Sequence, residues 1–315
     1  MSSTSNSQNT AVLLLAHGSP ESVDDIPDFV RYVVGGRPVP PQIVEEIKHR
    51  YSLIGCSPLN EITMRQGKAL ERELGLPVYV GMRNWKPFIP DVVKTMPADG
   101  VSRAIAICLA PQNSRTSVGL YRGAVMGESG TPFALEFIES WHDHPLLVRA
   151  FAEKLLTGWE SACRQVGSKL PVIFTAHSVP QRTITEGDPY ESQSRETAAL
   201  VAKTAGLADE DWSFAFQSQG MSGGPVSGNA WIGPTVEDMI LRWKEKGHIG
   251  VFIQPVGFLC DHVEVLYDID IGFKGFAANC GMQLWRAESL NDSPMLIAAL
   301  ADLTRSRLSQ FLEKA

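Results

Sequence analysis

The sequence predicts an α/β protein built from mostly parallel sheets with helices on both faces. Short apolar runs alternate with longer helix-like segments along the whole chain, which is the pattern of parallel sheets. The length of 315 residues exceeds one typical core and predicts two domains. In addition, VLLLAHGSP near the N-terminus and VIFTAHSVP in the middle share an apolar run, Ala-His and a following proline. This similarity suggests a duplicated strand–helix unit.

Eight apolar runs predict strands, at residues 11–16, 77–81, 103–110, 133–138, 172–176, 212–217, 249–256 and 282–286. Helices are expected at residues 41–54, 63–74, 144–165, 192–205, 235–246 and 294–313. The polar, uncharged residues 1–10 are expected to form a disordered tail, and the domain boundary is placed inside the long central helix. The expected domains are therefore residues 11–155 and 156–290. The C-terminal helix, 291–315, is expected to pack back on the first domain because its apolar face needs cover.

The composition limits the classes of function and the compartment. A net charge of −7 and a pI near 5.6 argue against a nucleic-acid partner, which usually needs a basic face. The five cysteines are scattered and form no Cys-x-x-Cys pair, which suits a reducing cytosol and argues against a zinc ribbon. No signal peptide is recognised, and no apolar stretch reaches the roughly 18 residues of a membrane span. The chain is expected to be cytoplasmic.

His177 is the first candidate functional residue. It ends an apolar strand, Pro180 stops that strand, and Gly187-Asp188-Pro189 supplies the turn before a helix. In α/β proteins, ligands usually bind at the carboxyl ends of strands. His17 occupies the equivalent place in the N-terminal half. The alternative is a histidine that only hydrogen-bonds its own loop.

The segment CDHVEVLYDID, residues 260–270, is the second candidate. If it is helical, Asp261, Glu264 and Asp268 are spaced i, i+3 and i+7 and share one face. Such a row of carboxylates repels itself, so a site or route for a cation is one interpretation and a solvated acidic face is the other. His177 and Glu264 are too few ligands for a structural zinc site. They suit a transient metal contact or a pair that accepts protons.

Two further patterns receive less weight. Gly220-Met221-Ser222-Gly223-Gly224 matches the nucleophile elbow of hydrolases, but Pro225 and Gly228 prolong a loop where that elbow needs a helix. No dinucleotide or Walker-type glycine loop follows the strands that end at Ala16 and Ala176. Trp231 belongs either to the core or to a surface that stacks on a flat aromatic ligand.

Taken together, these motifs resemble the ferrochelatase family, which inserts ferrous iron into a porphyrin. The loop of His177 with Gly187, Asp188 and Tyr190 looks like the family signature. It is joined, in order along the chain, by SPLNEIT, RNWKPF, LAP, QS, WIGP and PVGFLCDHVEVLYDID. The resemblance covers nearly the whole chain after the tail, and the short form is similar to the soluble bacterial enzymes. It implies two Rossmann-like, doubly wound domains with the porphyrin in the cleft.

The resemblance also implies the roles of individual residues. His177 and Glu264 match the catalytic pair, and Asp268 joins them as the third residue expected to meet the metal. The expected substrate-binding residues are Arg50, Tyr51, Ser57, Tyr121, Trp231 and His17. His17 stands where the soluble enzymes commonly have a tyrosine near the iron. Ferrous iron is implied as a substrate with no permanently bound cofactor, and a transient partner of the haem pathway is left open.

The mechanism expected from the sequence starts with a porphyrin bent out of plane in the cleft. His177, held neutral, accepts a pyrrole proton or contacts the entering iron, while Glu264 neutralises charge and relays protons. Coproporphyrin III and protoporphyrin IX both remain open as substrates. The alternatives are a sirohydrochlorin-type iron or cobalt chelatase, which the Ala-His-Gly sequence at Ala16 would fit, and a haem or metal carrier without catalysis.

Overall fold

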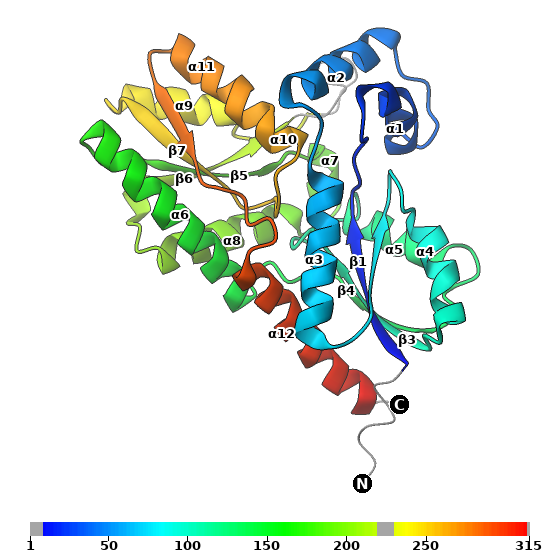
Figure 1. Ribbon diagram of the computed structural model, residues 1–315. Coiled ribbons are helices and arrows are strands. Elements are labelled where there is room, and N and C mark those ends of the chain that lie inside the picture. Colours follow the sequence, from blue (N-terminus) through cyan, green and yellow to red (C-terminus); the bar gives the residue numbers. More distant parts are fainter. Residues whose placement is uncertain (1–8, 219–229, 314–315) are drawn as a thin grey trace. The chain divides into compact units, whose positions relative to one another are not determined.

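The computed structural model describes residues 9–218 and 230–313 (Figure 1). It divides the chain into two compact units, and each is described by itself below. The first unit comprises Met1–Lys48, Ser57–Trp141 and Asn291–Ala315. The second unit comprises His49–Cys56 and His142–Leu290.

The first unit contains a four-stranded parallel sheet in the order β2-β1-β3-β4. Its strands are β1 (Thr10–Ala16), β2 (Val78–Met82), β3 (Arg103–Cys108) and β4 (Ala134–Ile138). Val12 of β1 lies opposite Val78 on one side and Ile105 on the other. Every residue of β1 is buried, because this central strand is covered on both faces.

Helices cover both faces of this sheet. They are α1 (Ile26–Val33), α3 (Leu59–Leu74), α4 (Ile89–Thr95), α5 (Val118–Met126) and α12 (Pro294–Glu313), with short 3₁₀ turns at Val23–Asp25 and Met96–Asp99. α4 and α5 share a core cluster with β1 and β3, and α12 packs against α3 and β3 (Figure 1). Helix α2 (Pro41–Ile54) is divided between the units, with residues 41–48 in the first and 49–54 in the second.

The second unit repeats this architecture with a parallel sheet in the order β6-β5-β7-β8. Its strands are β5 (Val172–His177), β6 (Trp212–Gln217), β7 (Gly250–Pro255) and β8 (Gln283–Arg286). Its helices are α6 (Pro145–Val166), α7 (Gln181–Thr185), α8 (Tyr190–Thr204), α9 (Val236–Glu245), α10 (Val263–Leu266) and α11 (Lys274–Asn279). A 3₁₀ turn (Asp209–Asp211) precedes β6, and a π-helix (Asp268–Phe273) lies between α10 and α11. α9 and α11 pack against the sheet in one core cluster, while α6 and α8 pack against each other and against the sheet.

The strand order places a possible ligand site at one edge of each sheet. In the first unit the chain changes direction across the sheet between β1 and β3, and in the second between β5 and β7. Ligands of doubly wound sheets bind at the carboxyl ends of the strands beside such a point. His17 directly follows β1 and His177 ends β5, so the two histidines occupy equivalent positions in the two units.

The α/β class, the parallel sheets and all eight strands expected from the sequence are confirmed, although β1 begins at Thr10, inside the expected tail. The C-terminal helix does pack on the first unit, where Gln66 donates to the carbonyl of Asn291 and Arg305 pairs with Glu73. The sequence placed the domain boundary inside the long helix, whereas the structure assigns all of α6 to the second unit. The reason is that α6 packs against β7, β8 and α8.

None of the helices in the described part of the chain has the length and apolar character needed to cross a membrane.

Candidate active site

Close packing of two strand ends determines the position of His177. β5 is buried from Val172 to Ala176, and its final residue, His177, keeps 30% of its side chain exposed. Beside it, the backbone N–H groups of Val256 and Gly257 both donate to the carbonyl of Thr175, at 2.8 and 3.2 Å. A Cβ on Gly257 would lie 2.8 Å from Cβ and 2.9 Å from Cα of Ala176. Glycine is therefore required where the chain leaving β7 passes the end of β5.

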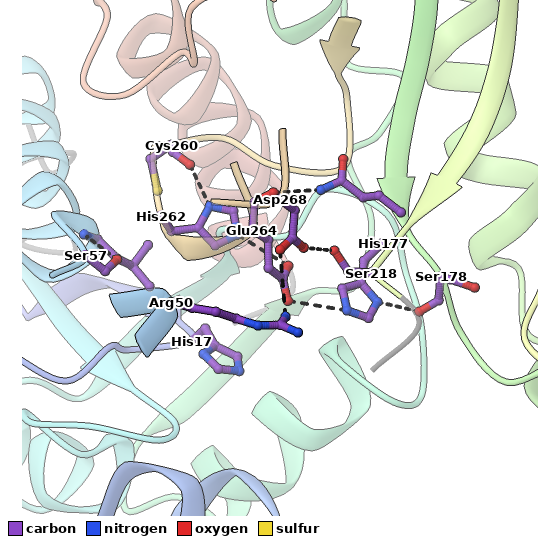
Figure 2. A network of polar contacts seen from close by, with 12 residues as sticks. His17, Arg50, Ser57, His177, Ser178, Ser218, Cys260, His262, Glu264 and Asp268 are labelled. Atoms are coloured by element: carbon purple, nitrogen blue, oxygen red, sulfur yellow. Dashed lines mark hydrogen bonds and ion pairs between the residues drawn. The ribbon is translucent and has the colours of Figure 1, made fainter. Parts of the chain in front are cut away.

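Glu264 lies between two imidazole rings (Figure 2). Its Oε1 is 3.3 Å from Nε2 of His177, and its Oε2 is 3.4 Å from Nε2 of His262. The carbonyl of Glu264 accepts a hydrogen bond of 2.8 Å from Nε2 of the buried Gln217 at the end of β6. Three separate segments, β5, the end of β6 and α10, therefore meet at Glu264.

The hydrogen bonds of Nδ1 in His177 and His262 determine which ring nitrogen can exchange a proton with Glu264. Nδ1 of His177 bonds the carbonyl of Ser178, and Nδ1 of His262 bonds the carbonyl of Cys260 at 3.0 Å. A carbonyl only accepts, so Nδ1 carries a proton in both rings and Nε2 is the nitrogen that exchanges one with Glu264. The arrangement is a carboxylate flanked by two nitrogen atoms, each able to hold one proton.

The charges of His177 and Glu264 stabilise each other. Burial on its own lowers the pKa of His177, but the Glu264 carboxylate and the carbonyl of Ser178 outweigh it and raise that pKa to about 9. Burial likewise favours neutral Glu264, yet His177 and His262 hold its pKa well below the usual range. The sequence hypothesis held His177 neutral. The pKa of about 9 instead favours an imidazolium paired with a carboxylate at neutral pH.

This pairing can be tested by titrating the histidines in ¹⁵N-labelled protein by NMR, with His177→Gln to assign the signal. The His177 ring is expected to be charged at pH 7 and to lose its proton only as the pH rises through about 9. In Glu264→Gln the main cause of the raised pKa is gone while burial remains, so the titration is expected to move below 6.5, the ordinary value. A His177 signal that titrates near 6.5 in both proteins would contradict the ion pair.

Asp268 follows Glu264 by one turn and has its own set of partners. Ser218, at the end of β6, donates its hydroxyl to Oδ2, and Arg50 lies 4.0 Å from Oδ1 (Figure 2). The Arg50 guanidinium also lies over the ring of Tyr267, 5.2 Å from its centroid. Burial and the neighbouring Glu264 carboxylate raise the pKa of Asp268 to about 6. Its side chain is 14% exposed.

The π-helix that begins at Asp268 buries its apolar side chains in the core of the second unit. Ile269 and Phe273 are buried in the core cluster beneath α9, together with Val265 of α10. The amide of Gly272 bonds the carbonyl of Tyr267, five residues earlier, which is the π pattern. Single π turns inside helices are rare and often lie at functional sites, because the extra residue changes which side chains share a face.

The prediction that three carboxylates share one helical face is therefore wrong for Asp261. Asp261 precedes α10 in irregular backbone, where its Oδ1 accepts a hydrogen bond of 2.7 Å from Ser289 and lies 3.4 Å from Arg286. Asp270, which was not part of the expected row, also pairs with Arg286. Glu264 and Asp268 of the original three remain close enough for the Glu264 carboxylate to raise the pKa of Asp268.

The other substrate-binding residues expected in the second unit lie at different depths. Trp231 is half-buried with its ring 6.4 Å from that of His177, edge to face. Tyr51 is buried, with 3% of its surface exposed. Arg50, described above, is 39% exposed on its side chain. Trp231 and Arg50 therefore lie close to the His177–Glu264 pair, and the substrate contacts of all three remain predictions.

Three predicted site residues belong to the first unit. His17 is exposed, and its ring lies 6.0 Å from that of Phe29. Ser57 is half-buried and accepts a hydrogen bond from the amide of Leu59 at the start of α3. Tyr121 is 5% exposed and belongs to the core cluster, with the Arg83 guanidinium over its ring. Their proposed contacts with substrate stay predictions.

The sequence interpretation did not assign a role to three residues that the structure brings to this site: His262, Gln217 and Ser218. A signal existed for each, since His262 stands two residues from Glu264, and Gln217-Ser218 follows a strand. The nucleophile-elbow match at 220–224 lies outside the described residues.

His177, Glu264 and Asp268 do not form a ready-made metal site. Across residues 9–218 and 230–313, no three His, Cys, Asp or Glu side chains are grouped closely enough to hold a metal ion. Side-chain nitrogens of His177 and His262 lie 3.3 and 3.4 Å from the carboxylate oxygens of Glu264, and a nitrogen of Arg50 lies 4.0 Å from Oδ1 of Asp268.

Comparison with known proteins identifies the family. A model of the ferrochelatase family matches residues 9–308. A ferrochelatase from Acidobacterium capsulatum is 54% identical over 318 residues, covering 96% of this chain and 96% of the relative. A coproporphyrin III ferrochelatase from a Geobacillus species is 35% identical, covering 94% of this chain and 97% of the relative. Among solved structures, SirB from Bacillus subtilis with Fe³⁺ covers 94% of both chains with a TM-score of 0.57 at 10% identity, which shows a shared fold. The chain therefore belongs to the ferrochelatase family, enzymes of haem biosynthesis that insert ferrous iron into a porphyrin.

Proposed function

We propose that iron insertion takes place over the carboxyl ends of β5 and β7, with His177, Glu264 and His262 exchanging protons and Asp268 receiving the metal together with Glu264. The observation that carries this proposal is the position of Glu264 between two Nε2 atoms, at 3.3 and 3.4 Å. Both catalytic side chains keep about a third of their surface exposed, at 30% for His177 and 32% for Glu264. They are therefore accessible to a substrate.

The reaction requires groups that take up protons. A free-base porphyrin carries two pyrrole N–H protons, and replacing them with Fe²⁺ releases both. A neutral Nε2 on His177 can accept one of these protons and pass it through the Glu264 carboxylate to His262, which leaves Nε2 of His177 free to accept the second. General acid–base catalysis by positioned groups of this kind contributes about 10²- to 10⁴-fold.

The raised pKa of His177 implies an order of events. In the metal-free protein, Glu264 keeps His177 protonated, so the ring cannot accept a proton. A ferrous ion that approaches Glu264 and Asp268 supplies the positive charge that the imidazolium had supplied, which lowers the pKa of His177. The ring then loses its proton to solvent, and its Nε2 is free for a pyrrole proton. Arrival of the metal thereby activates the base.

We further propose coproporphyrin III as the porphyrin substrate. The Geobacillus relative, which is 35% identical over 94% of this chain, carries that substrate in its name. The test is anaerobic turnover of the purified protein with ferrous iron and, in parallel, coproporphyrin III and protoporphyrin IX, followed by loss of free-porphyrin absorbance. Faster metallation of coproporphyrin III is expected. Faster metallation of protoporphyrin IX would overturn the substrate assignment, and binding of both without metallation would favour a carrier.

The remaining proposals concern compartment and partners. All five cysteines are free thiols, which supports a reducing, cytoplasmic location. We propose that iron is handled only as a substrate and that the protein has no resident cofactor, because the imidazole–carboxylate pair offers too few ligands for a permanent site. The net charge of −7 supports a function without nucleic acid. Transfer of the product to a partner of the haem pathway stays a proposal.

A further inference from the structure

The acidic segment from Asp261 to Asp270 presents its carboxylates in two directions. Glu264 and Asp268 interact with His177, His262 and Arg50, as described above. Asp261 and Asp270 instead both pair with the guanidinium of Arg286. The segment that carries Glu264 is therefore also bound to the guanidinium of Arg286, through Asp261 and Asp270.

All three guanidinium nitrogens of Arg286 make a hydrogen bond at this point. Its Nε and Nη2 donate to the two oxygens of Asp270 at 2.7 and 2.9 Å, and Nη2 lies 3.4 Å from Oδ1 of Asp261. Its Nη1 donates to the carbonyl of Ala287 at 2.9 Å. The Arg286 side chain is 16% exposed and that of Asp270 is 38% exposed, so this fork is partly shielded from water. A paired fork of this kind fixes orientation as well as distance.

The two attached residues lie on either side of the catalytic carboxylates in the chain. Asp261 stands three residues before Glu264, and Asp270 stands two residues after Asp268, inside the π-helix. The carboxyl end of β8, where Arg286 lies, is at the same edge of the sheet as His177. A single rigid group on the sheet thus holds both ends of the segment that brings Glu264 to within 3.3 Å of His177.

We propose that Arg286 is a positioning residue for iron insertion, which acts by holding the segment of Glu264 and Asp268 in register with His177. The inference rests on the function proposed for Glu264. Catalytic groups lose activity steeply when misplaced, so release of this segment is expected to reduce the rate of the chemical step more than it weakens porphyrin binding.

The experiment compares Arg286→Met, Arg286→Lys and Asp270→Asn with the wild-type protein in anaerobic iron-insertion assays. Arg286→Met is expected to lower kcat by roughly 10- to 100-fold with little change in KM for the porphyrin. Arg286→Lys keeps the charge but loses the fork, so it is expected to restore part of the rate. The matched control is Lys154→Met, which removes the nearby ion pair with Glu288 and is expected to leave kcat unchanged.

A double-mutant comparison distinguishes a positioning role of Arg286 from a role in stability alone. If Arg286 acts through Glu264, Arg286→Met is expected to reduce the rate far less in a Glu264→Gln background than in the wild type. Equal losses in both backgrounds would overturn the proposal, as would a folded Arg286→Met protein with wild-type kcat. Should Arg286→Met fail to fold, Asp270→Asn and Arg286→Lys decide in the same way, because wild-type kcat in both contradicts the proposal.

The same assays separate this inference from the proposal on which it rests. If Glu264→Gln itself keeps the wild-type rate, the function proposed for Glu264 fails. If Glu264→Gln is inactive while the Arg286 and Asp270 variants are fully active, only the positioning role fails.

Discussion

Replacing His177 with alanine is expected to lower kcat for iron insertion by roughly 10²- to 10⁴-fold, the range for a lost general base. His177 is the last residue of β5. Its Nε2 lies 3.3 Å from Oε1 of Glu264, and its Nδ1 donates to the carbonyl of Ser178. Alanine removes the nitrogen that exchanges the proton. Glu264 would retain His262 as a neighbour, which cannot replace a group at the position of His177.

The measurement is a steady-state assay of iron insertion, combined with a separate titration of porphyrin binding by fluorescence quenching. Porphyrin binding is expected to change little, so the loss appears in kcat. His248→Ala is the matched control, because His248 contacts the ring of Trp243 edge to face and precedes β7, at the opposite edge of the sheet from His177. A folded His177→Ala protein that binds porphyrin and turns over at nearly the wild-type rate would refute the assignment.

Substituting Gly257 with alanine is expected to reduce both stability and turnover, although Gly257 carries no reactive group. The added Cβ would lie 2.8 and 2.9 Å from the Cβ and Cα of Ala176, the residue that directly precedes His177. One of these contacts is with backbone, which cannot rotate away. Overpacking of this kind typically costs about 1–3 kcal/mol of the free energy of unfolding. Displacement of His177 by a fraction of an ångström would additionally lower kcat.

Thermal or urea unfolding and the iron-insertion assay measure the two effects. Gly275→Ala supplies the control, since Gly275 lies in α11 and an added Cβ meets nothing within 4 Å. Alanine is favoured over glycine inside a helix by roughly 0.5–1 kcal/mol, so this variant is expected to be slightly more stable and fully active. Wild-type stability and turnover in Gly257→Ala would show that the two strand ends tolerate separation.

The sequence by itself determined the class of fold and the strands, and it led to His177 and Glu264 as the proposed catalytic pair. Apolar runs such as 172–176 identify strands because burial on both faces of a sheet demands continuous hydrophobic residues. His177 and Glu264 could be proposed because each follows such a run, where parallel strands end at a common edge. The motifs around them also led to the ferrochelatase family, which the match over residues 9–308 supports.

Only the tertiary structure shows which acidic residues pair with Arg286 and which lie beside His177 and His262. Helical spacing grouped Asp261 with Glu264 and Asp268, but irregular backbone and a π turn direct Asp261 and Asp270 to Arg286 instead. The charge of His177 likewise depends on a carboxylate 87 positions away in the chain, at 3.3 Å in space. Local periodicity cannot specify such contacts, because they depend on how separate segments pack and on the burial that packing produces.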